Sequence, residues 1–226
     1  TYLVLDQDKF IICTINKTTY KIIHSEKALI DFTKEDLNFE KLNQFIEHNI
    51  FKIEKNLKNF VKNIYIILNS KEFFQIKLSI KKNNNGNIIN PKTLIHPLND
   101  LKNSFQSNHQ NQKIIHMLIE NYYIDNKQYF SLPQNLKCDF FSLEVKFICL
   151  SKVFVRNLEA ILKKYHILIN QILCASYIKN FESENNSDIF TTASKIVSGY
   201  NNNEVILVDK TSRNKGFFEK FFDFFN

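Results

Sequence analysis

Histidine and cysteine are the residue types in this chain best suited to chemistry, as general bases, nucleophiles or metal ligands. The six histidines stand apart from one another and from any nucleophile. No two cysteines form a C-x-x-C pair, and no histidine lies at a zinc-like offset from them. We therefore predict buried thiols in a reducing compartment, with no catalytic, cofactor-binding or metal-binding residue and no cofactor. The residues considered are His24, His48, His96, His109, His116, His166, Cys13, Cys138, Cys149 and Cys174.

The net charge of +7 and the pI near 9.1 suit an anionic partner, either a nucleic acid or an acidic lipid surface. The basic residues are spread along the chain, and arginine occurs only at Arg156 and Arg213. Heavy use of Ile, Phe, Asn and Lys resembles a coding bias, so the asparagine runs carry little functional weight. We expect no nucleic-acid partner, and a basic nucleic-acid-binding module stays an alternative.

The last eleven residues, GFFEKFFDFFN, contain six phenylalanines. On a helix these rings gather on one side, opposite Glu219, Lys220, Asp223 and Asn226. Lys210, Arg213 and Lys215 come just before. The pattern predicts a weak, reversible membrane anchor. The residues predicted to bind the membrane are Arg213, Lys215, Phe217, Phe218, Lys220, Phe221, Phe222, Phe224 and Phe225.

Two other interpretations of this tail stay open. In one, the helix folds back and covers the protein's own core, and in the other it lies in a groove of a partner protein. The polar segment NNNEVILVDKTSRN before it favours a linker and a free tail. No apolar run reaches about 18 residues, so we expect no spanning helix. We also expect no secretory signal.

The first part of the chain predicts strands and one long helix. Residues 1–7, 9–17 and 20–30 resemble a meander of three short strands. A helix follows, with Leu42, Phe45, Ile46, Asn49, Ile50 and Ile53 at helical spacing. A buried strand (63–70) and a half-exposed strand (73–82) come next, then a turn at 83–87.

The remainder alternates between strands and helices. A helix over 97–108 has Pro97 near its start, and a strand beginning near 113 turns at Asp125-Asn126. A strand over 140–152 places Leu143, Val145, Phe147 and Cys149 on one face. A helix (153–166), a strand with a helical turn (167–181) and a short helix follow. The order predicts an α+β fold.

Residues 113–181 resemble the inserted region of the bacterial cell-division protein FtsA family. In that family a strand with a histidine and an aspartate precedes a Leu-Glu strand, an Asn-Leu helix and an Ala-Ser helix. The order and spacing hold over about 70 residues, and the strands and helix before them also fit. The matching positions are His116, Tyr123, Asp125, Leu143, Glu144, Asn157, Leu158, Ala175 and Ser176.

The resemblance implies a fold and its divisions. The fold would be a reduced actin-like (ribonuclease H-like) lobe with an inserted FtsA-type SHS2 domain and a C-terminal amphipathic helix. In the family the inserted domain takes part in self-association and in contacts with other division proteins. The divisions are 1–72 and 153–200 for the lobe, 73–152 for the insert, 201–215 for a linker and 216–226 for the membrane-targeting helix.

The sequence departs from that family at the nucleotide site. Actin-like ATPases hold phosphates in glycine-rich hairpins, because backbone N–H groups must come close to the phosphate oxygens. Here the first hairpin is LDQDKF, with Asp6 and Asp8 and no glycine. The family's second nucleotide lobe has no counterpart before the tail. We therefore expect no ATPase activity, and metal binding at these aspartates would need partners that the sequence does not show.

The sequence thus predicts a non-enzymatic adaptor of the bacterial division apparatus, on the inner face of the cytoplasmic membrane, that recruits or links division proteins. The alternatives are an actin-like ATP-binding protein with a divergent or incomplete site, and the nucleic-acid-binding module named above.

Overall fold

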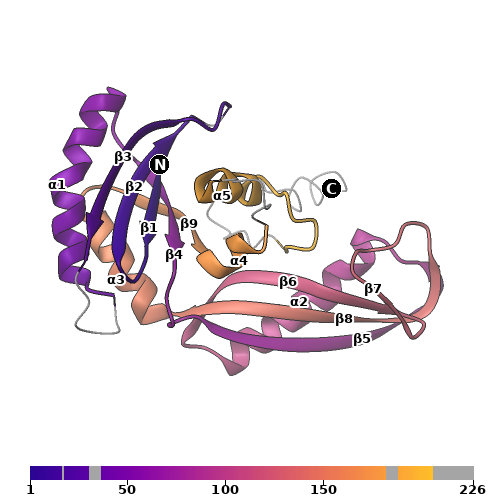
Figure 1. Cartoon of the computed structure of the whole chain (residues 1–226). Coiled ribbons are helices and arrows are strands. Elements are labelled where there is room, and N and C mark those ends of the chain that lie inside the picture. The colour runs from indigo at the N-terminus through magenta and orange to yellow at the C-terminus, as the bar shows by residue number, and fades with distance from the viewer. Residues whose placement is uncertain (17, 31–36, 182–187, 206–226) are drawn as a thin grey trace. The chain divides into compact units, whose positions relative to one another are not determined.

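The structure is a computed structural model that describes residues 1–16, 18–30, 37–181 and 188–205. It is a mixed α+β protein with two sheets. The chain divides into two compact units (Figure 1). The first unit contains residues 1–73 and 150–198, and the second contains residues 74–149 together with the chain from 199 onward.

The first unit is built on a five-stranded sheet in the order β3-β2-β1-β4-β9. The three N-terminal strands pair antiparallel, which confirms the predicted meander, and β4 and β9 add parallel to β1. All four residues of β1 are buried, so both faces of the sheet are covered there. The strands are β1 (Tyr2–Leu5), β2 (Lys9–Ile15), β3 (Ile22–Leu29), β4 (Asn63–Leu68) and β9 (Leu168–Cys174).

Helices cover the two faces of this sheet. On one face the Phe45 ring of α1 packs 5.9 Å from the Phe10 ring. Phe39, also on α1, meets Phe154 of α3 at 5.4 Å. On the other face, Phe190 of α5 lies 6.0 Å from Tyr2. The helices are α1 (Phe39–Leu57), α3 (Lys152–Lys163), α4 (Ala175–Lys179) and α5 (Ile189–Val197).

Helix α1 buries the face that its sequence predicts. Leu42, Phe45, Ile46, Asn49, Ile50 and Ile53 are its buried residues. Asn49 is tolerated there because its side-chain amide donates to the Phe45 carbonyl at 2.8 Å. The helix begins after Asn38, whose side chain accepts from the Lys41 N–H at 2.9 Å.

The second unit has a four-stranded sheet in the order β5-β8-β6-β7. Its strands are β5 (Phe74–Ile88), β6 (Gln112–Ile124), β7 (Lys127–Tyr129) and β8 (Lys137–Ser151). The predicted turn at 83–87 is wrong, since β5 continues through it with a shift of register against β8 between Asn83 and Asn87. Asn85 and Gly86 have φ of 52° and 73° there, which glycine and asparagine adopt most readily.

Helix α2 (Pro91–Asn108) packs on this sheet. It begins six residues before the predicted start, because Asn90 caps it by accepting from the Lys92 and Thr93 N–H groups. Pro97 therefore lies inside the helix, where it is buried and supplies no N–H. The Phe105 ring stacks on Phe147 of β8, with centroids 4.9 Å apart and planes 4° apart.

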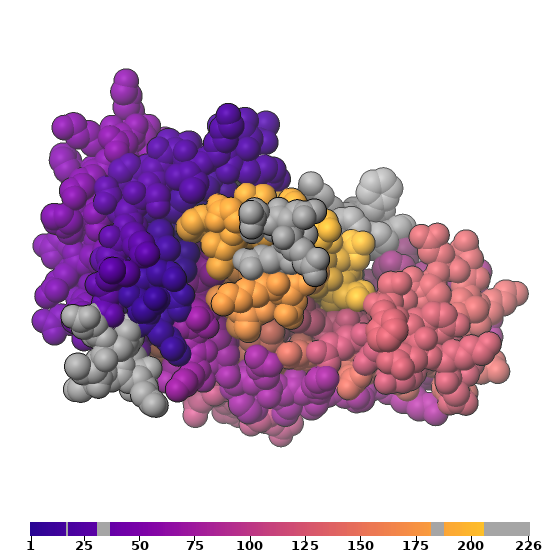
Figure 2. All heavy atoms as spheres, in the orientation of Figure 1, coloured from indigo at the N-terminus to yellow at the C-terminus, as the bar shows by residue number. Residues whose placement is uncertain are grey.

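The chain from Gly199 to Val205 lies on β6 of the second unit. Ile119 N–H donates to the Asn203 carbonyl at 2.9 Å, and Val205 N–H donates to the Met117 carbonyl at 2.8 Å. Figure 2 shows the yellow atoms of this segment against the pink atoms of the unit. The sequence predicts a linker from residue 201. In the structure, residues 203–205 form hydrogen bonds with β6, on the same edge of β6 that pairs with β7.

Candidate functional site

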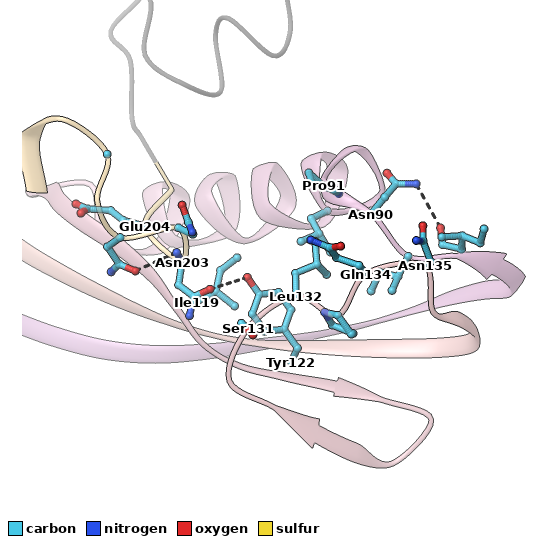
Figure 3. A pocket seen from close by; sticks show the side chains of 17 residues that line it. Asn90, Pro91, Ile119, Tyr122, Ser131, Leu132, Gln134, Asn135, Asn203 and Glu204 are labelled. Carbon is cyan, nitrogen blue, oxygen red and sulfur yellow. Dashed lines mark hydrogen bonds between the residues drawn. The ribbon is translucent and has the colours of Figure 1, made fainter.

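A cavity in the second unit has a volume of about 660 Å³, within the range of about 300–1,000 Å³ typical of ligand sites. Four pieces of chain form it: the start of α2, strand β6, the loop after β7 and the segment 199–204 (Figure 3). We call it the amide pocket, because asparagine and glutamine side chains line much of it. Its lining residues are Ile88, Ile89, Asn90, Pro91, Leu94, Ile119, Tyr122, Ser131, Leu132, Pro133, Gln134, Asn135, Gly199, Asn201, Asn202, Asn203 and Glu204.

The floor of the amide pocket is apolar and firmly placed. Ile89, Leu94, Ile119 and Tyr122 are buried members of the unit's core, and Leu132 packs against it. Strand β6 supplies Ile119 and Tyr122. Leu94 comes from the first turns of α2. An entering apolar group would therefore meet side chains that are already held by the core.

One wall of the pocket is the segment 199–204, which three contacts hold through Asn203. Its backbone carbonyl accepts from Ile119, as described above. Its side-chain oxygen accepts from the Tyr122 hydroxyl at 3.2 Å, and its amide nitrogen donates to the Phe130 carbonyl at 2.7 Å. Asn203 thereby joins the segment, β6 and the loop after β7.

A second attachment of this wall is the contact between His116 and Glu204. His116 Nδ1 lies 2.7 Å from Glu204 Oε1, and the exposed fractions of the two side chains are 0% and 10%. Because no surface of the His116 side chain is exposed, it cannot reach a substrate. The pair joins residues 88 positions apart in the sequence and holds the wall on β6.

The chemistry of the pocket is that of a neutral binding site. Its rim has the amides of Gln134, Asn135 and Asn202, which make no side-chain hydrogen bond among the described residues. Burial raises the pKa of Tyr122 to about 12, so the phenol is neutral at physiological pH. Amide groups above an apolar floor suit a peptide segment with an apolar side chain. The pocket presents no nucleophile with an adjacent base.

The turn between β1 and β2 differs from the glycine-rich, phosphate-binding hairpin of actin-like ATPases. Asp6 Oδ1 accepts from the Gln7 N–H and from Asn69 Nδ2, each at 2.8 Å. Its other oxygen lies 3.5 Å from Lys9 Nζ. Burial acts to raise the pKa of Asp6, but the Asn69 and Gln7 hydrogen bonds and the Lys9 charge lower it overall. Asp6 is therefore an ionised, internally bonded carboxylate.

A cavity of only about 20 Å³ adjoins this turn. Leu5, Asp6, Gln7, Leu37, Leu68, Asn69, Ser70 and Lys71 line it. A volume of that size holds about one water molecule. The described residues here thus enclose a water-sized space beside a carboxylate.

The residues predicted to bind a membrane lie outside the described part of the chain. These are Arg213, Lys215, Phe217, Phe218, Lys220, Phe221, Phe222, Phe224 and Phe225. Among the helices of the described residues, none combines the length and the apolar character that crossing a bilayer requires.

The histidines and cysteines form no metal site in the part of the chain that the structure describes, where no three His, Cys, Asp or Glu residues gather. All four cysteines are free and buried, as predicted. The sequence analysis missed the amide pocket. Its asparagines at 201–203 were discounted as coding bias, and no local pattern connects them with Asn90 or Gln134.

Comparison with known proteins shows a likeness in fold. The sequence matches no protein-family model and no curated protein. A chain from the solved PilM–PilN type IV pilus biogenesis complex aligns with a TM-score of 0.50 and 6% identity, covering 78% of this chain and 47% of that one. The cytoplasmic domain of EpsL, an inner-membrane component of the type II secretion system of Vibrio cholerae, aligns with a TM-score of 0.40 and 11% identity, covering 78% and 57%.

The first of these alignments is consistent with an actin-like fold. The FtsA family is not among these structures, so that part of the resemblance stays a prediction. The chain spans about half the length of the solved chains it matches.

Proposed function

We propose that this protein is a non-enzymatic, membrane-associated adaptor that holds other proteins at the inner face of the cytoplasmic membrane. The proposal rests on the β1–β2 turn, which has Asp6, bonded to Asn69 and close to Lys9, at the position where the resemblance puts a phosphate-binding hairpin. Recruitment raises the local concentration of a partner and needs no chemical step.

Phosphate binding at this turn would be unfavourable for two reasons. Asp6 and Asp8 place negative charge at the turn, and Lys9 Nζ lies 3.5 Å and 3.6 Å from their oxygens. The turn has no glycine, and the chain's glycines are Gly86, Gly199 and Gly216, far from it in sequence. Without glycine, backbone N–H groups cannot easily approach a phosphate.

The class of partner is a protein of a membrane-associated assembly. The solved chain with the same fold comes from a complex for type IV pilus biogenesis, which supports a role in such an assembly. Within that class we propose cell division, from the FtsA resemblance. The second unit has the order strand, helix and three strands (β5, α2, β6, β7 and β8). From the FtsA resemblance we assign it to an SHS2-type insert over 73–152.

The membrane contact would be made by the aromatic tail. Burying one phenylalanine stabilises by about 1.5–3 kcal/mol, whereas ordering a residue costs about 1–2 kcal/mol of backbone entropy. Six rings therefore contribute about 9–18 kcal/mol, which is close to the cost of about 10–20 kcal/mol for ordering about ten residues, so the rings alone give little net affinity. Lys210, Arg213 and Lys215 would each contribute about 1 kcal/mol near an anionic leaflet. The result is a weak and reversible anchor.

Vesicle co-sedimentation tests the proposal directly. The full chain and a chain ending at Asp209 are compared on vesicles of anionic and of neutral lipid. We expect the full chain to sediment with anionic vesicles and the shortened chain to stay in solution. A full-length variant with Phe221, Phe222, Phe224 and Phe225 changed to Ser is the matched control. Equal sedimentation of all three chains would contradict the membrane anchor.

Affinity capture on those vesicles then identifies the partner class. Division proteins would support the FtsA-like assignment, whereas pilus or secretion components would support the assembly type of the structural neighbours. Filter binding with a salt titration tests the nucleic-acid alternative, since phosphate contacts give a steep salt dependence. We expect no retention of nucleic acid at physiological salt.

A further inference from the structure

The amide pocket has an apolar floor and a neutral rim. The described part of the chain ends beside this pocket. Glu204 lines the pocket, and Val205, the last described residue, packs against the same core. Twenty-one residues follow Val205, and six of the last eleven are phenylalanine. The described chain therefore ends beside an apolar cavity, ten residues before an apolar segment in the sequence.

We propose that the amide pocket is the docking site for the aromatic tail, residues 216–226, of the same molecule. The occupied pocket would hold phenylalanine rings on the floor formed by Ile119, Tyr122 and Leu132. The inference does not rest on lipid binding. If the tail binds both the amide pocket and lipid, the pocket and the membrane compete for the same phenylalanine rings.

The length of the intervening chain allows this docking. Residues 206–215 number ten and span at most about 33–36 Å when fully extended. A short linker gives its two ends an effective concentration of the order of millimolar. The tail of the same molecule therefore has an advantage over any free peptide of similar sequence at cellular concentration.

The chemistry of the two parts also matches. The tail has Glu219 and Asp223 against Lys220, which gives a net charge of −1. The pocket rim is made mainly of amides, so it neither attracts nor repels a segment of such low charge. Gln134, Asn135 and Asn202 offer donors and acceptors to the backbone of an entering segment.

The size of the pocket supports an aromatic occupant. Its volume of about 660 Å³ accommodates more than one side chain. Leu94 and Ile119 are buried, whereas Leu132 in the loop after β7 is partly exposed at the side of the floor. A ring inserted beside Leu132 would bury apolar surface on both partners.

The test uses a single tryptophan, because the chain has none. Phe222→Trp in the full chain reports on the tail, and acrylamide quenching without lipid measures its exposure. Leu132→Asp places a charge in the pocket. Leu29→Asp, on β3 of the first unit and 76% exposed, is the matched control. We expect Leu132→Asp to raise the quenching constant about threefold and Leu29→Asp to leave it unchanged.

Equal quenching in the three chains would overturn the proposal. Protection that is lost on dilution from 100 to 1 μM would show exchange between copies and would overturn docking within one molecule. Far-UV circular dichroism checks that Leu132→Asp keeps the fold.

A second measurement does not depend on that variant. Backbone amide shifts of the full chain are compared with those of the four-serine tail variant, and we expect changes at Ile119, Leu132 and Asn135. Unchanged shifts at these residues would also overturn the proposal. Because no lipid is present, failure of the membrane anchor leaves these results unaffected.

Discussion

Asp6 illustrates how a single side chain defines the turn between the first two strands. Its carboxylate serves the turn itself, through the Gln7 N–H, and the end of β4, through Asn69. The same contacts lower its pKa below the ordinary value of 3.8, against the effect of burial. Acidic residues in a hairpin therefore act here as internal acceptors.

Replacing Asp6 with Ala should reduce the free energy of unfolding at pH 7 by about 1–2 kcal/mol, because hydrogen bonds to a charged acceptor are lost. The lowered pKa means that the stabilisation is complete above about pH 4 and is lost as the pH falls through the folded-state value. Denaturant unfolding at pH 7 and pH 3 measures the difference, which should shrink at pH 3. Asp8→Ala, at a side chain 68% exposed, should change little.

The cysteines give a second prediction at the scale of single residues. Burial raises the pKa of Cys13 to about 11 and that of Cys149 to about 12, so neither is a thiolate at neutral pH. We expect the native chain to react very slowly with a thiol reagent at pH 8 and the unfolded chain to react at all four cysteines. Fast labelling of the native chain would contradict the burial of these thiols.

At the scale of elements, one stacked pair contributes to the packing of helix α2 on the sheet of the second unit. Phe105→Ala removes the ring that packs on Phe147 and should cost about 3–5 kcal/mol. Amide exchange in α2 and β8 should become faster accordingly. Gln106→Ala, on the exposed side of the same helix, is the control. A cost below about 1 kcal/mol would show that the site collapses around the missing ring.

The attachment of residues 199–205 to β6 depends on His116. His116→Ala removes its 2.7 Å contact with Glu204. We expect the amides of Ile119 and Val205 to exchange about tenfold faster, as their hydrogen bonds to this segment open more often. His96→Ala, at an exposed position on α2, should leave those rates unchanged. Unaltered exchange after His116→Ala would mean that Asn203 alone holds the wall.

Patterns within one element were readable from the sequence. The alternation of Leu143, Val145, Phe147 and Cys149 predicts the buried face of β8, and the structure confirms it, with all four side chains fully buried. The start of α2 was missed although its signal is local, since Asn90 and Pro91 mark it. Features that depend on distant residues were not readable, such as the docking of residues 203–205 on β6. The amide pocket unites four separate pieces of chain, so no local signal indicates it.

At the scale of the whole molecule, a fold consistent with the actin-like class accompanies a β1–β2 turn that has no glycine. The likeness in fold gives no reason to assume nucleotide turnover, because activity depends on the site and not on the fold. The sequence resemblance predicted an actin-like fold, with which the structural neighbour is consistent. A role in the division apparatus stays a proposal.

We expect the full chain to bind ATP more weakly than about 1 mM, with or without Mg²⁺, because the turn supplies charge of the wrong sign and no glycine. Titration calorimetry measures this affinity. A dissociation constant in the micromolar range would contradict the non-enzymatic proposal and would favour the alternative of a divergent nucleotide site.

The pairing of Phe74 with Cys149 has an evolutionary consequence. Residues 74–149 therefore begin and end at positions that face each other in the antiparallel pair of β5 and β8. A single hairpin turn of about two to five residues would therefore close the gap that their excision leaves. Such a stretch can be acquired, deleted or transplanted into another gene in one recombination event. Its ancestry can consequently differ from that of the scaffold that carries it.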